Sequence, residues 1–355
     1  MQFLSPKESD QWKILLDTII REQKDPDEGF EYISLIHHGR RCAFCFAAGV
    51  RLAESGYLKE AFSWLTAGAA FECIDNTLCG YIKSYITRNG GLVTSSHPFG
   101  DPTAYLPFTE VTPLKYGKEV FISEMIRSLP DFNREIKLLD VGCGDGSLTG
   151  QIIASLLRRG LVSGISELYL VEPSAPMLTR AASDLSELFP DMKIQSHEVH
   201  IQDVSTRLSP DTDIVVTSLS CHHMPYLDKE ILFRQIGEKT RHLLVFEIDA
   251  NHDLPEKNSP ELLVSIYQSY GRLITLLLNH PSPSGAGERC ADYFLMAEVI
   301  SLLTEERGVR RDYHMVKEQW MGLLANSLGS DFTLKCDTTC YADPWMGLFF
   351  LHYGK

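Results

Sequence analysis

Beyond residue 130 the chain alternates between short apolar runs and longer stretches with helical spacing. The apolar runs lie at residues 138–141, 168–171, 213–219 and 242–249, and small or acidic residues close each of them. Residues 147–157 place apolar side chains three and four positions apart, as in a helix that packs on a sheet. Strand-like runs that alternate with helices are typical of an α/β protein with a parallel sheet.

The first hundred residues have helical periodicity instead. Residues 11–22 are amphipathic, and residues 42–54 and 58–73 predict two more helices joined at Gly56. Because glycine at such a point ends a helix, these two form a helical hairpin. We expect residues 1–108 to be a helical domain that caps the rest of the chain or forms a homodimer.

Two further segments interrupt this plan. Residues 90–113 are rich in Gly, Ser, Thr and Pro and predict an irregular connector. Residues 250–311 form an insertion after the last parallel run, with helical stretches at 261–278 and 292–304. An insertion at the ligand edge of a sheet is expected to form a lid over the substrate. Residues 315–328 predict one more helix.

The turn after the first apolar run carries the most specific signal. Asp140 closes the run, and glycines follow at positions 142, 144 and 146. Glycine permits positive φ and lets a ligand lie against the backbone. A dinucleotide fingerprint would place its third glycine at Ser147, so the spacing argues against a nicotinamide or flavin site.

With this motif the chain resembles the class I S-adenosylmethionine-dependent methyltransferases, whose first motif is an acidic residue followed by G-x-G-x-G. The resemblance covers residues 109–355 and implies a Rossmann-like seven-stranded sheet with an antiparallel last strand. The runs at 331–336 and 346–353 fit that terminal strand pair. The expected architecture is therefore this α/β domain, with the N-terminal helical domain in front of it and the helical lid inserted at about 250–311.

The resemblance implies S-adenosyl-L-methionine as the cofactor and assigns its contacts. Glu172 ends the second run, where a carboxylate can accept both ribose hydroxyls, although it could also be a helix-entry residue before Pro173. Asp203 and the backbone amide of Val204 match the adenine contact of the family, although Asp203 could equally lie in a surface turn. The cofactor-binding candidates are Asp140, Gly142, Gly144, Gly146, Glu172, Asp203, Val204 and Ser220.

Catalytic candidates follow from chemistry at the same edge of the sheet. His222 and His223 are the base candidates, because histidine titrates nearest physiological pH. In an extended segment adjacent side chains alternate, so only one of them should face the reaction centre; both could instead be ordinary loop histidines. Tyr116 is expected to cover the methionine moiety, since an aromatic face attracts a sulfonium, or else to pack the connector onto the sheet.

The insertion and the fifth run supply candidates for binding the acceptor. Acids at this edge favour an acceptor with a positive or hydrogen-donating group, whereas an arginine could anchor a carboxylate. Each of these side chains could also be a solvated or packing residue. The substrate-binding candidates are Glu247, Asp249, His252, Tyr267, Tyr270 and Arg272.

The composition of the chain limits the classes of partner that it is expected to bind. The 355 residues carry a net charge of −14, from 33 basic and 47 acidic side chains, which disfavours a nucleic-acid partner. The sequence has neither a signal pattern nor an apolar run of spanning length, so we expect a cytoplasmic protein without a membrane anchor. Cys42, Cys45, Cys73 and Cys79 could bring four thiolates together, but they lie in helical stretches, which favours core packing over a metal site.

The sequence thus predicts methyl transfer from S-adenosylmethionine to a nucleophilic N, O, S or C atom of a small molecule, amine-bearing or amino-acid-like. Holding donor and acceptor in line would do most of the work. Two alternatives remain open. The chain could methylate a protein or nucleic acid docked on the helical domain, or it could be a noncatalytic protein that binds the cofactor and uses this domain for interactions.

Overall fold

The computed structural model describes residues 3–94, 102–206, 211–281 and 285–355, and in this part of the chain seven strands form one mixed sheet. The strand order is β3-β2-β1-β4-β5-β7-β6. β1 to β5 run parallel, and β7 enters antiparallel between β5 and β6, as the sequence predicts. The strands are β1 (Glu135–Val141), β2 (Gly164–Val171), β3 (Ile194–His197), β4 (Thr212–Ser218), β5 (Thr240–Asp249), β6 (Thr333–Ala342) and β7 (Gly347–Gly354).

Helices cover both faces of this sheet because successive strand residues point to opposite sides. Leu138 packs into the core formed with α7, α8 and α9, whereas Leu139 packs into the core formed with α10 and α14. Burial on both faces explains why the central strands are continuous apolar runs. The helices are α7 (Thr112–Ser128), α8 (Ser147–Arg159), α9 (Ala175–Leu188), α10 (Tyr226–Lys239) and α14 (Lys317–Ser327).

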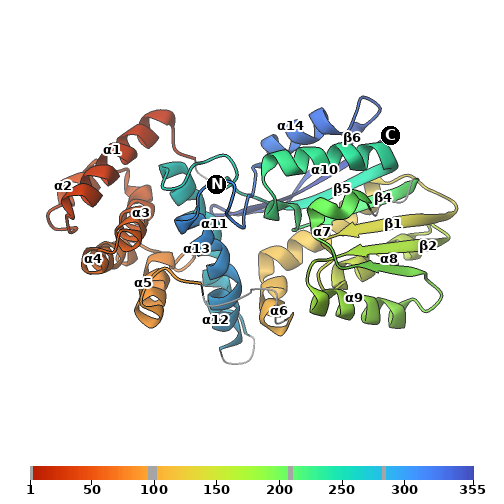
Figure 1. Cartoon of the computed structure of the whole chain (residues 1–355), viewed down its shortest axis with the longest axis horizontal. Coiled ribbons are helices and arrows are strands. Elements are labelled where there is room, and N and C mark those ends of the chain that lie inside the picture. Colours follow the sequence, from red (N-terminus) through yellow and green to blue (C-terminus); the bar gives the residue numbers. More distant parts are fainter. Residues whose placement is uncertain (1–2, 95–101, 207–210, 282–284) are drawn as a thin grey trace.

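The N-terminal helices and the insertion form the other half of the molecule. Figure 1 shows α1 to α5 at one end, the sheet at the other, and the insertion helices between them. α3 and α4 form the predicted hairpin and approach closely at Gly49, where a Cβ atom would lie 2.7 Å from Leu65 Cγ. Cys45 and Cys79 are buried, whereas Cys73 is exposed. The helices are α1 (Pro6–Glu22), α2 (Phe30–Leu35), α3 (Arg41–Glu54), α4 (Leu58–Ala69), α5 (Leu78–Asn89), α11 (Pro260–Leu278), α12 (Ala286–Cys290) and α13 (Met296–Thr304).

One hydrophobic core runs from the N-terminal helices through the insertion to the sheet. α11 contacts α1, α3 and α5 on its N-terminal side. Two buried polar contacts reinforce this packing: Asn76 Nδ2 donates to the Tyr267 carbonyl at 2.8 Å, and the Thr77 and Thr275 hydroxyls lie 2.9 Å apart. The insertion is therefore held against the N-terminal helices.

The connector differs from the prediction. The expected irregular segment at 90–113 contains α6 (Pro102–Glu110). Proline is tolerated at the start of a helix, and aromatic packing stabilises the rest: the Tyr105 and Phe108 rings each lie 5.0 Å from the Phe294 ring. Tertiary contacts thus outweigh a composition that is typical of loops.

None of the described helices is both long enough and apolar enough to cross a membrane.

Candidate active site

The glycine turn after β1 brings three parts of the chain close together. Gly142, Gly144 and Gly146 have φ values of 75°, 55° and 76°. A Cβ atom on Gly142 would lie 2.3 Å from Ser220 Cβ, and one on Gly146 would lie 2.8 Å from Ala181 Cβ. Gly144 has nothing within 4 Å of such an atom and faces open space. The turn therefore needs two glycines for packing and keeps its middle backbone accessible.

Asp140 lies buried beneath this turn. The Thr149 hydroxyl donates to its Oδ2, while Oδ1 is buried without a hydrogen-bond partner among the described residues. Burial is the main reason that the pKa of Asp140 is raised to about 6; the hydrogen bond from Thr149 lowers it and the charge of Glu172 adds to the rise. A carboxylate oxygen without a donor, at the wall of a cavity, fits a ligand that carries positive charge or a hydrogen-bond donor.

Glu172 holds the turn in place and also lines the cavity. Its Oε2 accepts from the Gly144 amide at 3.1 Å, and its Oε1 accepts from the Ser174 amide at 2.9 Å, at the entry to α9. Both sequence interpretations of Glu172 thus describe part of its surroundings. Burial raises the pKa of this carboxyl.

Two cavities lie end to end at this edge of the sheet. The outer one has a volume of about 110 Å³ and follows the glycine turn. The inner one has a volume of about 40 Å³ and lies under α6 and the insertion. Both are lined by Tyr105, Leu219 and His223.

The other cofactor candidates differ in their distance from the outer cavity. Ser220 lines it, and its hydroxyl donates to the Val141 carbonyl at 2.7 Å. The Asp203 side chain is exposed, and the neighbouring Ile201 lines the cavity instead. The side chain of Val204 lies outside the described residues.

The histidine pair corrects one sequence prediction. His222 and His223 lie in a 3₁₀ turn (Cys221–His223), not in an extended segment, and both line the inner cavity. Leu219, with φ of 51°, bends the chain at the end of β4, which explains why the expected alternation fails. The two rings lie 4.2 Å apart.

Glu247 fixes the geometry of this turn. Its Oε1 accepts from the amides of Ser220 and Cys221 at 3.1 and 3.0 Å, and its Oε2 lies 2.9 Å from His222 Nδ1. A carboxylate in this position accepts the Nδ1 proton, so the neutral ring of His222 has its lone pair on Nε2. Burial alone would lower the pKa of His222, but the charge of Glu247 and its hydrogen bond raise it. Glu247 is fully buried and positions His222 without lining either cavity.

His223 is oriented in a similar way. Its Nδ1 lies 3.1 Å from the Arg311 carbonyl, which can only accept, so Nδ1 carries the proton. Burial lowers the pKa of His223 to about 3, and the neighbouring His222 contributes to this shift.

Several candidates lie away from the cavities. Asp249 accepts from the Lys317 amide at 3.1 Å. Arg272 forms ion pairs with Asp75 and Asp343, each at 2.9 Å. Tyr116 is 54% exposed and packs near Tyr341, so it does not cover the cavity, and Tyr105 of α6 occupies that place. The predicted lid residue was wrong because the connector folds as a helix.

Of the three remaining insertion candidates, Tyr270 lines the inner cavity. Tyr267 packs against Phe46 at 5.6 Å between ring centroids, and His252 is fully buried.

Sequence reasoning missed the acidic side of the inner cavity. Tyr270 donates its hydroxyl toward both Glu298, at 2.9 Å, and Asp312. Burial raises the pKa of Glu298 to about 8, and the charge of Asp312 adds to this shift. Burial alone would raise the pKa of Asp312 too, but the charges of His314 and His252 hold it well below its usual value. The D-x-H spacing of Asp312 and His314 was the available signal.

Comparisons with known proteins agree with this geometry. A family described as a methyltransferase domain matches residues 115–305, which is more than half of the chain. No curated protein matches the sequence.

Solved structures with similar folds include SCL7 from Oryza sativa, with a TM-score of 0.56 and 14% identity over 82% of this chain and 93% of that one. This similarity shows the fold. Magnesium protoporphyrin IX methyltransferase from Synechocystis, with bound SAH, gives a TM-score of 0.40 and 13% identity over 68% of this chain and 85% of that one. The cyclopropane synthase MmaA2 from Mycobacterium tuberculosis gives a TM-score of 0.42 and 10% identity over 73% of this chain and 94% of that one.

Proposed function

The chain belongs to the methyltransferase-domain family, whose members are S-adenosylmethionine-dependent enzymes, and on that premise we propose that it methylates a small molecule held in the inner cavity. The observation that carries this proposal is the small volume of that cavity, about 40 Å³, together with its position directly behind the outer one. A cavity of this size, covered by α6 and the insertion, suits a compact group of a metabolite better than a protein or nucleic-acid segment.

The outer cavity fits the cofactor. When bound, S-adenosylmethionine supplies an electrophilic methyl group on a positively charged sulfur. Asp140, Glu172 and Asp145 line the cavity and give it a negative charge that suits this cation. Glu172 would accept the ribose hydroxyls, and the backbone at Gly144 would lie against the ligand.

The inner cavity favours an acceptor with an apolar part and a polar end. Leu273, Phe294 and Leu295 line it with apolar side chains, and His223, Tyr270 and Glu298 add polar groups. Such an arrangement orients a small molecule by its single hydrogen-bonding or amine group. We therefore propose a nucleophilic nitrogen or oxygen as the methylated atom.

His223 is the residue that we propose to orient the acceptor, because burial lowers the pKa of its ring to about 3 and makes it a weak base. It lines both cavities, and with Nδ1 donating to the Arg311 carbonyl its lone pair lies on Nε2. Its Nε2 would accept a hydrogen bond from the N–H or O–H group of the acceptor and hold the nucleophilic atom toward the methyl group of the cofactor. Tyr105 and Leu219 would exclude water from the junction and keep the reacting atoms in line.

The helical region also enters the proposal. We propose that residues 1–108 act as a cap that supports the lid, because α3 and α5 pack against α11 of the insertion. The methyltransferase domain then comprises residues 109–355. The exposed side of the cap is our candidate for a homodimer contact, and the cytoplasm is the compartment in which we place the reaction.

The test uses S-adenosylmethionine with a deuterated methyl group and a cell extract separated into small-molecule, protein and RNA fractions. We expect label in a small metabolite. Gly142→Ala should abolish the transfer, because its Cβ would lie within 2.3 Å of Ser220. Gly90→Ala is the matched control, since Gly90 also has positive φ, of 76°, but has nothing within 4 Å.

Two outcomes would overturn the proposal. Label that appears in protein or RNA would assign a macromolecular acceptor. Cofactor binding without transfer to any fraction would favour the noncatalytic alternative.

A further inference from the structure

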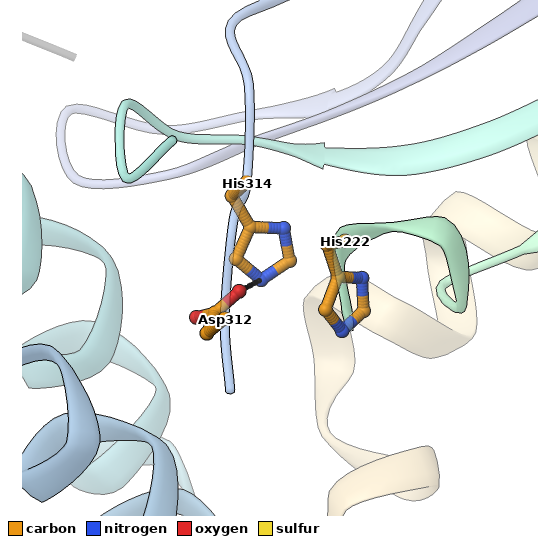
Figure 2. A group of neighbouring side chains, drawn as sticks. All are labelled: His222, Asp312 and His314. Atoms are coloured by element: carbon orange, nitrogen blue, oxygen red, sulfur yellow. Dashed lines mark ion pairs between the residues drawn. The ribbon is translucent and has the colours of Figure 1, made fainter. Parts of the chain in front are cut away.

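Two histidines that line the inner cavity meet an aspartate that lies behind them. His222 comes from the turn after β4, whereas Asp312 and His314 come from the segment that precedes α14 (Figure 2). One ligand atom from each lies within 4.8 Å of the others. The exposed fractions of the three residues are 5%, 0% and 3%, so the group is closed to bulk solvent.

The polar atoms of this group lack the partners that burial requires. Asp312 Oδ1 and His314 Nδ1 are buried without hydrogen-bond partners among the described residues, as is Glu298 Oε1 nearby. The Tyr270 hydroxyl contacts both Glu298 and Asp312, yet it has only one proton to donate. A proton on Glu298 would supply its contact with Tyr270 but would leave Asp312 Oδ1 and His314 Nδ1 without a hydrogen bond to any described residue. Because buried polar groups are normally satisfied, these atoms point to a further ligand.

The orientation of His222 points to a cation. Its Nδ1 proton is donated to Glu247, which two backbone amides hold in place, and so Nε2 is the ring atom that is left to bind a cation. In metal sites, the imidazole nitrogen that does not bind the metal usually donates its proton to a carboxylate or carbonyl group. The His222 and His314 rings lie 4.0 Å apart, and His314 Nε2 lies 3.5 Å from Asp312 Oδ1.

We propose that His222, Asp312 and His314 bind one divalent transition-metal ion. Two imidazoles and one carboxylate are a donor set that suits zinc or iron(II) and leaves coordination positions open. The ion would neutralise Asp312 and coordinate its Oδ1, which makes no hydrogen bond to a described residue and has only a 3.5 Å contact with His314 Nε2. This metal site was not expected from the sequence, in which the metal candidates were cysteines.

The position of the site suggests its use. His222 and His314 line the inner cavity, so an open coordination position would face the acceptor. This part rests on the proposed function: a nitrogen or oxygen atom of the acceptor would bind the ion, which would lower the pKa of that group and hold it toward the methyl donor. The acceptor would then be a small metal-binding molecule.

The first experiment measures metal binding alone. Untagged full-length protein is treated with a chelator, dialysed, and titrated with Co²⁺ while its visible absorption is recorded. We expect one equivalent per chain and ligand-field bands without the thiolate charge-transfer absorption that cysteine ligands would give. Wild-type protein that binds no stoichiometric Co²⁺, or binds it through thiolates, would overturn the proposal and leave a proton-sharing network as the explanation.

Variants then assign the ligands. Asp312→Asn and His314→Gln should remove the stoichiometric site, and Glu247→Gln should weaken it by about 10- to 100-fold because it frees the His222 ring. His352→Gln is the matched control, since His352 is an equally buried histidine that pairs with His242 elsewhere in the core. Undiminished Co²⁺ binding by Asp312→Asn would exclude this ligand set.

The metal titration can be interpreted independently of variant folding and of methyl transfer. Near-UV circular dichroism of each variant reports whether its core is intact, and the wild-type titration stands even if a variant fails to fold. No cofactor or acceptor is present in the titration. Failure of methyl transfer would therefore leave the metal result unchanged, and failure of metal binding would leave the proposed transfer open to its own test.

Discussion

Replacing Asp140 with asparagine should change how stability depends on pH. In the folded chain the pKa of Asp140 is about 6, against 3.8 for an unperturbed aspartate, chiefly because the carboxyl is buried. Between these two values the folded state keeps a proton that the unfolded state has lost. Ionisation of Asp140 therefore destabilises the fold as pH rises through this window.

The magnitude follows from the difference in pKa. Each unit corresponds to about 1.4 kcal/mol, so a shift of about two units costs about 3 kcal/mol by pH 7. Asparagine cannot ionise and can still accept from Thr149. We compare the free energy of unfolding of Asp140→Asn with that of the wild type at each pH. The difference, variant minus wild type, should increase by about 2 to 3 kcal/mol from pH 4 to pH 7, whatever the difference is at pH 4.

Urea denaturation of both proteins at several pH values gives this difference directly. Asp213→Asn is a control of opposite sign. Burial alone would raise the pKa of Asp213, but its ion pair with Arg134 lowers it. This variant should therefore lose stability relative to the wild type as pH rises toward about 4, and the difference should stay nearly constant above that pH because Asp213 is then ionised in both states. A difference for Asp140→Asn that stays flat across the range would mean that Asp140 titrates normally, and the account of its burial would be wrong.

Two further predictions concern buried charges. Lys229 is fully buried, with its Nζ 3.1 Å from Asp253 Oδ2. Asp253→Asn should lower the free energy of unfolding, measured in urea, by about 3 to 5 kcal/mol because it removes the carboxylate that pairs with this cation. Lys229→Met combined with Asp253→Leu should recover most of that loss of stability. Burial lowers the pKa of His242 to about 4 and that of its neighbour His352 further, so these groups make the wild type less stable as pH falls from about 6.5 to 4. His352→Gln should flatten this dependence; an unchanged slope would show that the pair does not titrate as described.

The sequence predicts the sheet and the cofactor turn well because both depend on local signals. The glycines after Asp140 are required where they stand, by positive φ and by the contact with Ser220. Apolar runs buried on both faces can hardly be anything but central strands. Glu172 could be placed beside the glycine turn because the end of a parallel strand fixes the position of its side chain; its contact with a ribose stays a prediction.

The acceptor end was harder to predict because it depends on distant contacts. The His222–His223 pair faces the cavity only because the chain bends at Leu219, and Tyr105 reaches it only because α6 packs on Phe294. Asp312 comes from a segment some ninety residues further along, and its D-x-H spacing with His314 is a local signal that does not show which part of the fold it joins.

α11 touches both ends of the molecule. On one side Tyr267 and Thr275 are tied to the loop before α5, and on the other Tyr270 and Leu273 form part of the acceptor cavity. This helix therefore joins the two halves of the molecule: a displacement of the N-terminal helices that moved α11 would also move part of the wall of the inner cavity. The shape of this cavity thus depends on contacts that do not line it.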